Sequence, residues 1–205
     1  CSSDLRGDRV AILSNNRPEW NITDFGAQLA GAVLVPIYPT ISEGDLKFIL
    51  GDCEAKIVVV SSKEIAEKTT SASKEMASPP VIYTINDVPG YPHYSELVKD
   101  GKANPRREVI SEVMKETKPS DLLTILYTSG TTGTPKGVML SHNNLVSNIV
   151  DLCDLPPVDH TSRALSFLPL NHIYERMLTY LYLLKGPSIY YAESIETIAA
   201  NIKEV

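Results

Sequence analysis

Short apolar runs alternate with helical segments along the first 85 residues, and this alternation restricts the fold more than any other feature. Four runs have the length and the β-branched content of buried strands, at residues 8–14, 33–39, 55–61 and 79–85. Helical segments separate them, at residues 19–32, 42–53 and 63–76. Apolar strands connected by helices favour a parallel sheet that is covered on both faces. We therefore predict an α/β fold, with a layered, mostly parallel sheet flanked by helices.

Two of these helices carry specific expectations. In 42–53, Ser42 is the expected N-cap, because its hydroxyl can accept a hydrogen bond from the first turn. The inward-facing residues of this helix are expected to be Leu46, Ile49 and Leu50. In 19–32, the apolar residues have helical spacing, at positions 22, 25, 29 and 32.

The second half of the chain continues the alternation. Residues 86–120 are less regular, with one short helix expected at 95–101. Further strands are expected at 121–130, 163–170 and 188–194, and further helices at 143–153, 174–186 and 195–205. The polar, Pro-containing stretch after Cys153 is the best candidate boundary. We predict a first α/β lobe at 1–153, a linker at 154–161 and the start of a second lobe at 162–205.

Composition narrows the class of protein. The 205 residues carry a formal net charge of -6 without a basic stripe, which argues against a nucleic-acid partner. No apolar run approaches the ~20 residues of a transmembrane helix. Three widely spaced cysteines are expected to be free thiols in a reducing compartment, so we expect a cytoplasmic protein, with peripheral membrane contact left open. The pattern predicts no metal-ligand cluster.

One loop has the composition of a ligand-binding segment. Residues 128–137, TSGTTGTPKG, contain five Ser or Thr residues, three glycines and one lysine, and no acid. Glycines let backbone N–H groups approach an anion, hydroxyls donate to phosphate oxygens, and Lys136 supplies a positive charge. The alternative is a flexible, solvent-exposed loop without a ligand, although such loops usually also contain acidic residues. We interpret this stretch as a phosphate-binding loop.

The loop differs from a Walker A motif. Gly130 and Gly133 are only three residues apart, and Gly137 follows Lys136 where a Walker motif has Ser or Thr. The apolar VML that comes next is typical of a strand, and only then does SHNN indicate a helix cap. The expected order is therefore strand, loop, strand, helix.

At this point the sequence resembles a known family. YTSGTTGTPKGVMLSH (127–142) is similar to the phosphate-loop signature of the adenylate-forming superfamily, which includes acyl-CoA synthetases, luciferases and adenylation domains. AQLAGAVLVPIYPT (27–40) resembles an earlier conserved region, and LPLNHIYER (168–176) a later one. The H-x-Y-E-R form and YYAES (190–194) are similar to the long-chain fatty acyl-CoA synthetase branch. The resemblance extends over nearly the whole chain and implies a partial N-terminal domain.

The resemblance implies a two-step ligase reaction. A fatty acid carboxylate attacks the α-phosphorus of ATP with Mg²⁺, giving acyl-adenylate and pyrophosphate, and coenzyme A then displaces AMP. It also implies a site. Residues expected to bind the cofactor are Thr128, Ser129, Gly130, Thr131, Thr132, Gly133, Thr134, Lys136, Tyr174 and Glu175. The loop residues would hold the β- and γ-phosphates, whereas Tyr174 and Glu175 match the pattern of the long-chain branch. Lys136 and His172 are the expected catalytic residues, with His172 lining the acyl-adenylate pocket.

Several of these residues have structural alternatives. His172 can be a core or capping histidine, and Glu175 can serve the first turn of a helix. His142 is expected to organise the helix that follows it. The Tyr and Leu residues at 177–184 are expected in the core rather than in an acyl tunnel. His93 and His160 are expected at the surface.

The resemblance also implies missing parts. The family's Tyr/Thr/Glu motif, ribose-binding Asp, hinge and C-terminal lysine do not occur in these 205 residues, and both ends lie within secondary-structure patterns. We therefore expect an N-terminal piece of an ATP-dependent acid–thiol ligase, inactive alone. The alternatives are another acid-activating ligase, or a non-catalytic ATP- or anion-binding module of the same fold.

Overall fold

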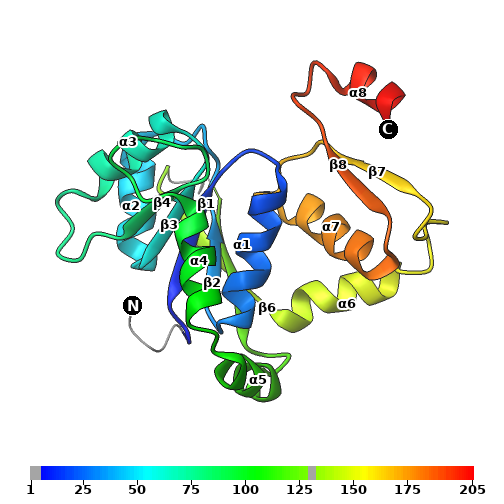
Figure 1. Ribbon diagram of the computed structural model, residues 1–205, viewed down its shortest axis with the longest axis horizontal. Helices are drawn as coiled ribbons and strands as arrows, with labels where there is room; N and C mark the ends of the chain where they lie inside the picture. Colours follow the sequence, from blue (N-terminus) through cyan, green and yellow to red (C-terminus); the bar gives the residue numbers. More distant parts are fainter. Residues whose placement is uncertain (1–5, 129–132) are drawn as a thin grey trace.

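A six-stranded sheet forms the centre of the molecule in the computed structural model, which describes residues 6–128 and 133–205 (Figure 1). Its strands are β1 (Arg9–Leu13), β2 (Val33–Pro36), β3 (Ile57–Val60), β4 (Val81–Thr84), β5 (Leu122–Thr128) and β6 (Lys136–Ser141). The strand order is β4-β3-β1-β2-β5-β6, and every neighbouring pair is parallel except β5 and β6. The predicted α/β fold with a mostly parallel sheet is confirmed.

Helices cover both faces of this sheet, as the apolar strands require. Ala11 and Leu13 of β1 face α2 (Glu43–Cys53) and α3 (Lys63–Ser73). Val10 and Ile12 face the opposite layer, which contains α1 (Pro18–Leu29) and α4 (Tyr94–Ala103). Because successive side chains of a strand alternate between the two faces, one short strand contributes to both hydrophobic cores.

Helix α2 agrees with its prediction. The Ser42 hydroxyl accepts a hydrogen bond from the backbone N–H of Asp45 at 3.1 Å. Leu46, Ile49 and Leu50 are all buried.

Helix α1 buries a different face from the one suggested by its apolar residues. Ile22 and Leu29 are 56% and 42% exposed, whereas Trp20 and Asp24 are fully buried. The reason is a cation on another helix, because Asp24 accepts two hydrogen bonds from Arg176. A buried acid can define the inner face of a helix when a buried base lies opposite, and hydrophobic spacing does not report that.

The stretch 86–120 is more regular than predicted. It contains α4 and also α5 (Arg107–Glu116), which was not expected. His93, expected at the surface, is the N-cap of α4 and forms a capping box with Glu96. Its Nε2 lies 2.8 Å from the Ile85 carbonyl oxygen. His93 is half-buried, and its role as a helix cap was not anticipated from the sequence.

The C-terminal segment contains α6 (His142–Leu152), β7 (Arg163–Ser166), α7 (Ile173–Lys185), β8 (Ser188–Tyr191) and α8 (Ile198–Glu204). It packs against α1 and also directly against the sheet, where Leu123 of β5 contacts α6 and α7. β7 and β8 pair in parallel as a separate two-stranded sheet. Figure 1 shows α1 between the large sheet and the α6–α7 pair. The division into lobes at 154–161 stays a prediction.

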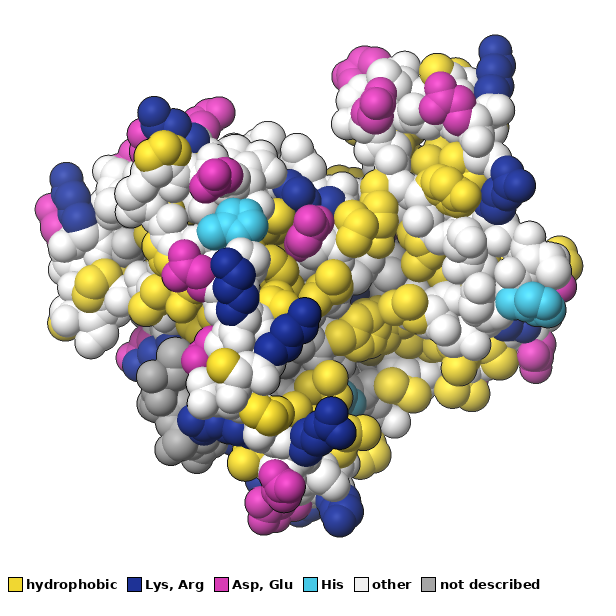
Figure 2. All heavy atoms as spheres, viewed as in Figure 1, with side chains coloured by type: hydrophobic (Ala, Val, Ile, Leu, Met, Phe, Trp, Pro, Cys, Tyr) yellow, Lys and Arg dark blue, Asp and Glu magenta, His cyan; other side chains and the backbone are white. Residues whose placement is uncertain are grey.

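The surface shows mixed charges. On the face in Figure 2, Lys and Arg side chains lie among Asp and Glu and among apolar groups. Residues 94–118, which include α4 and α5, contain six basic and five acidic residues, a net charge of only +1 (6 − 5). Within 6–128 and 133–205, no helix combines the length and the apolar character needed to cross a bilayer.

The ion pair between α1 and α7 has no exposed part. Arg176 Nε and Nη2 donate to the two carboxylate oxygens of Asp24 at 2.7 and 2.6 Å, and both side chains are 0% exposed. Tyr180 OH donates to the same carboxylate at 2.9 Å, and the guanidinium lies 5.9 Å from the centre of the Trp20 ring. Burial disfavours the charged guanidinium, but Asp24 more than offsets this and raises the pKa of Arg176.

We expect Arg176→Met to lower the free energy of unfolding by about 3–5 kcal/mol, because it leaves the Asp24 carboxylate buried without its cation. The double variant Asp24→Leu/Arg176→Met should recover much of that loss. Urea denaturation measures both, and Glu67→Gln, which breaks an exposed pair with Lys63, is the control, with a change below about 1 kcal/mol. Equal losses in the single and double variants would contradict the buried-charge explanation.

Candidate functional site

Parallel pairing brings the carboxyl ends of five strands to one edge of the sheet. The chain leaves β1 toward β2 and leaves β3 toward β4, on opposite sides, so a crevice forms between β1 and β3. Such switch points are where open α/β sheets bind ligands. A cavity of about 900 Å³ lies here, lined by residues that follow β1, β2, β3, β4 and β8.

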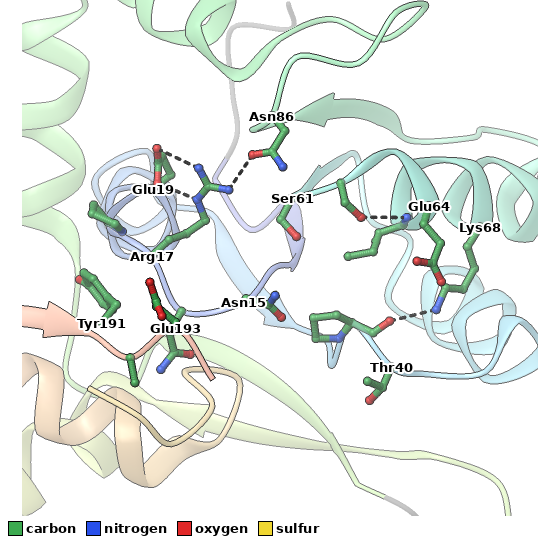
Figure 3. Close-up of a pocket in the computed structure, with 16 residues that line it drawn as sticks. Asn15, Arg17, Glu19, Thr40, Ser61, Glu64, Lys68, Asn86, Tyr191 and Glu193 are labelled. Carbon is green, nitrogen blue, oxygen red and sulfur yellow. Dashed lines mark hydrogen bonds and ion pairs between the residues drawn. The ribbon is translucent and has the colours of Figure 1, made fainter. Parts of the chain in front are cut away.

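Polar side chains line this cavity from several directions (Figure 3). Arg17, Glu19 and Asn86 lie on one side, Glu64 and Lys68 on the other, with Asn15 and Ser61 between them. The hydrogen bond from Arg17 to Glu19, at 2.8 Å, holds the pKa of Glu19 below its usual range. Arg17 also donates to Asn86 at 2.9 Å. This arginine is therefore oriented by two partners at the rim of the cavity.

Lys68 secures the opposite wall. Its ammonium group donates to the carbonyl oxygens of Pro39 at 2.9 Å and Ile41 at 3.0 Å. These two carbonyls belong to the segment between β2 and α2, so α3 fixes the chain where it leaves β2. This wall is consequently held by a side chain more than 25 positions away in the sequence.

Asn16 fastens the segment before α7 to the same edge. Its side-chain amide donates to the Leu168 carbonyl at 2.6 Å and to the Ser166 hydroxyl at 3.1 Å, and its oxygen accepts from the Leu170 N–H at 2.9 Å. One residue further, Asn171 accepts from the Trp20 indole at 3.0 Å. The start of H-x-Y-E-R is thereby docked beside the loop that follows β1.

His172, Tyr174 and Glu175 occupy the N-terminal turn of α7. His172 is the N-cap, and its Nδ1 accepts a hydrogen bond from the Tyr174 N–H at 3.3 Å. Tyr174 is 51% exposed, whereas Glu175 is buried. Burial raises the pKa of Glu175, and a hydrogen bond with Ser166 opposes this only in part. The positions agree with the structural alternatives, in which His172 caps the helix and Glu175 lies in its first turn. The catalytic and ligand-binding roles of these residues stay predictions.

The phosphate-loop stretch joins β5 to β6. Thr128 and Lys136 are the last paired residues of this hairpin, and Thr128, Gly133, Thr134 and Lys136 are exposed. Gly133 has φ +85°, a left-handed conformation that glycine adopts without strain. The predicted order of strand, loop, strand and helix is confirmed. The remaining predicted phosphate ligands, Ser129, Gly130, Thr131 and Thr132, lie outside the described residues.

The hairpin separates the two ends of the signature. β5 pairs with β6 from Leu122–Ser141 at one end to Thr128–Lys136 at the other. At ~3.4 Å per residue, His142 therefore lies roughly 20 Å from the loop. It begins α6 directly after the Ser141 N-cap. Burial lowers the pKa of His142, and its place at the helix start agrees with the expectation that it organises α6.

The donors present suit a polyphosphate better than a bare metal ion. Thr128, Thr134 and Lys136 offer hydroxyls and a cation, which match phosphate oxygens. Among residues 6–128 and 133–205, no three His, Cys, Asp or Glu side chains are grouped closely enough to hold a metal.

Sequence reasoning missed three polar residues that hold this part of the structure together, namely Asn16, Asp24 and Lys68. Asn16 had a usable signal, because an amide directly after a buried strand lies at the carboxyl edge of a parallel sheet. Asp24 and Lys68 had none, because their partners are fixed only by tertiary packing.

Comparison with known proteins defines the class. The sequence matches the family described as AMP-binding enzyme over residues 5–204. The chain therefore belongs to the AMP-binding enzyme family, and the α/β fold and the Gly/Thr hairpin agree with that membership.

Individual relatives point to one branch of the family. Over 83% of the chain, it is 35% identical to long chain acyl-CoA synthetase 6, peroxisomal, of Arabidopsis thaliana. Over 96% of the chain, it is 32% identical to the long-chain-fatty-acid–CoA ligase ACSBG2 of Xenopus laevis. It spans only 25% and 28% of these relatives. The chain is thus a relative of long-chain acyl-CoA ligases, and it aligns with about a quarter of their length.

A solved structure supports the fold. The N-terminal domain of FACL13 from Mycobacterium tuberculosis superposes with a TM-score of 0.73 at 24% identity. The superposition includes 98% of this chain and 48% of that domain. At this identity the likeness concerns the arrangement of helices and strands alone.

Gly137 should tolerate no side chain. A Cβ built on Gly137 would lie 2.9 Å from Ile125 Cγ2 and 3.3 Å from Tyr127 Cζ. We expect Gly137→Ala to lower the free energy of unfolding by about 1–3 kcal/mol, because overpacking forces its neighbours to shift. Gly51→Ala is the matched control: open space surrounds Gly51 in α2, so alanine should stabilise by about 0.5–1 kcal/mol. Urea denaturation compares the two, and equal effects would contradict the packing argument.

Glu175 should destabilise the folded chain at neutral pH. Since its pKa is raised in the folded state, the folded form retains a proton that the unfolded form loses above about pH 4.3. Stability from this group is therefore lost as pH rises. We expect Glu175→Gln to be more stable than the wild type at pH 7 and equal to it near pH 4, in thermal unfolding at each pH. The exposed Glu204→Gln should show no such pH-dependent difference; a Glu175→Gln effect that does not depend on pH would contradict the assignment.

Proposed function

We propose that this chain carries the triphosphate-binding part of a fatty acid–CoA ligase, which converts a fatty acid, ATP and coenzyme A to acyl-CoA, AMP and pyrophosphate. The observation that carries the proposal is the TSGTTGTPKG stretch, which begins at the carboxyl end of β5. This strand runs parallel to β2, so its carboxyl end lies at the same edge of the sheet as the cavity at β1 and β3. Family membership and the 32–35% identity to long-chain acyl-CoA ligases support it.

The chemistry gives each group a task. In the first step, a carboxylate oxygen bonds to the α-phosphorus of ATP while the bond to pyrophosphate breaks. Both reactants are anionic, so the reaction needs charge neutralisation and positioning more than proton transfer. Lys136 is the proposed cation for the β- and γ-phosphates, and the hydroxyls of Thr128 and Thr134 are proposed donors. In the second step, the thiolate of coenzyme A bonds to the acyl carbon, and AMP leaves.

The start of α7 is the proposed acyl-adenylate side of the site. His172 caps the helix with Nδ1, which leaves its Nε2 without a hydrogen-bond partner among residues 6–128 and 133–205 and available to a ligand. Glu175 remains buried where burial disfavours its charged form. A carboxylate that costs stability at such a position is typical of functional sites. Tyr174 lies beside them on the exposed side of the turn.

Two alternatives remain distinct from this proposal. Another acid-activating ligase would use the same phosphate loop with a different acid, and a panel of acids of different chain length separates the two. A non-catalytic anion-binding module would bind triphosphate without acid-dependent exchange of pyrophosphate into ATP. The H-x-Y-E-R stretch and the identities above favour the fatty acid.

Lys136→Ala should weaken triphosphate binding without unfolding the chain, because Lys136 is exposed and its proposed contact is with the ligand rather than with the fold. We expect an affinity loss of at least roughly tenfold for inorganic tripolyphosphate in calorimetric titration, since a charge-assisted contact contributes about 1.5–3 kcal/mol. Lys99→Ala, an exposed lysine of α4, is the control. Unchanged affinity, or a large drop in melting temperature with Lys136→Ala, would contradict the proposed role.

A further inference from the structure

One contact of the signature is not explained by phosphate binding itself. Tyr127 and Gly137 face each other across β5 and β6, directly beside the Thr128–Lys136 pair. The Tyr127 hydroxyl donates a hydrogen bond to the Asp52 carboxylate on α2. We propose that Asp52, Tyr127 and Gly137 are positioning residues that fix the end of the hairpin and thereby hold Lys136 in place for the triphosphate. This inference rests on the function proposed above.

Gly137 provides the room for this arrangement. The Tyr127 ring and the Ile125 side chain occupy the space that a Cβ at position 137 would need. Ile125 and Tyr127 are in turn packed against the core between the sheet and α2–α3. The aromatic ring can therefore lie across the hairpin and reach α2 only when residue 137 is glycine. Lys136 comes directly before Gly137, so this packing also fixes the backbone that carries the lysine side chain.

Asp52 provides the anchor outside the hairpin. It lies in the last turn of α2, where the negative end of the helix dipole disfavours a carboxylate. An acid at such a place lowers the stability of the helix unless a partner compensates it, and Tyr127 is that partner. Burial and the Asp52 carboxylate both raise the pKa of Tyr127, so its hydroxyl remains a protonated donor at neutral pH.

The anchor supplements a short strand pairing. β2 and β5 share a single paired position, Leu34 with Thr124, supported by a bond from the Thr124 hydroxyl to the Leu34 carbonyl at 2.6 Å. Beyond Thr124 the hairpin leaves the parallel sheet, and Tyr127 is three residues further on. The Tyr127–Asp52 bond is thus a second attachment, close to the loop.

The experiment measures local order and ligand binding in the same variants of the 205-residue chain. Tyr127→Phe and Asp52→Ala each remove the bond, and Asp52→Asn retains an acceptor. β6 is an edge strand, so only one of the neighbouring Gly137 and Val138 amides points toward β5. Hydrogen exchange of that paired amide reports the hairpin end, and calorimetry reports affinity for inorganic tripolyphosphate. Tyr83→Phe, on β4, is the matched control for loss of a tyrosine hydroxyl.

We expect Tyr127→Phe and Asp52→Ala to speed exchange of the paired amide by about tenfold and to weaken tripolyphosphate binding by roughly fivefold. The double variant should be no worse than either single variant, because both remove one interaction. Asp52→Asn should restore both readouts. Melting temperature should change little with Asp52→Ala, since removing the acid also favours α2. A merely structural bond would instead lower melting temperature and leave affinity per folded molecule constant.

The outcomes separate this inference from the proposed function. Unchanged exchange of the paired amide in both variants overturns the inference, whatever the binding data. Accelerated exchange with unchanged tripolyphosphate affinity overturns it also, because the hairpin end would then not position Lys136. If the wild type and Lys136→Ala both fail to bind tripolyphosphate, the proposed function of this chain is overturned. The positioning role given to the hairpin is then overturned as well. In that case, accelerated exchange would show that the Tyr127–Asp52 bond contributes only to folding.

Discussion

The buried ion pair between Asp24 and Arg176 joins the two halves of the structure. It has no contact with water, and two further groups, Tyr180 and Gln28, donate to the same carboxylate. Geometry of this kind is needed before two buried charges can offset their loss of hydration. Because Arg176 lies on α7, the pair determines where the first turn of that helix stands relative to α1. The proposed acyl-adenylate side of the site depends on it.

The parallel sheet supplies the other constraint. Its strands end at one edge, and the loops beyond them can therefore cooperate although they are far apart in the sequence. Asn16 extends this edge to β7 and α7 through three hydrogen bonds, and Lys68 holds the wall that follows β2. The exposed groups at this edge are consequently carried by fixed backbone, which suits a reaction that needs positioned donors rather than a strong base.

Much of the fold was predictable from the sequence for a definite reason. A strand buried on both faces must be apolar throughout, so β1, β2 and β3 appear as short apolar runs. The Ser42 cap and the inward face of α2 followed from local chemistry in the same way. The prediction was wrong where a polar residue forms the interior, as with Asp24 in α1, and it did not anticipate that His93 caps α4. In both cases the deciding partner is distant in the sequence or unusual for its role.

By itself, the sequence determined the α/β class, the hairpin that carries Lys136, and the membership in a family with a recognisable phosphate loop. These conclusions depend on local periodicity and on a contiguous motif, both of which can be read without knowing which distant residues are in contact. Only the tertiary structure decided that Asp24 and Arg176 face each other, that Tyr127 reaches Asp52 on α2, and that Glu175 is buried. Such contacts join residues brought together by the order of strands in the sheet, and that order is set by the packing of the whole chain.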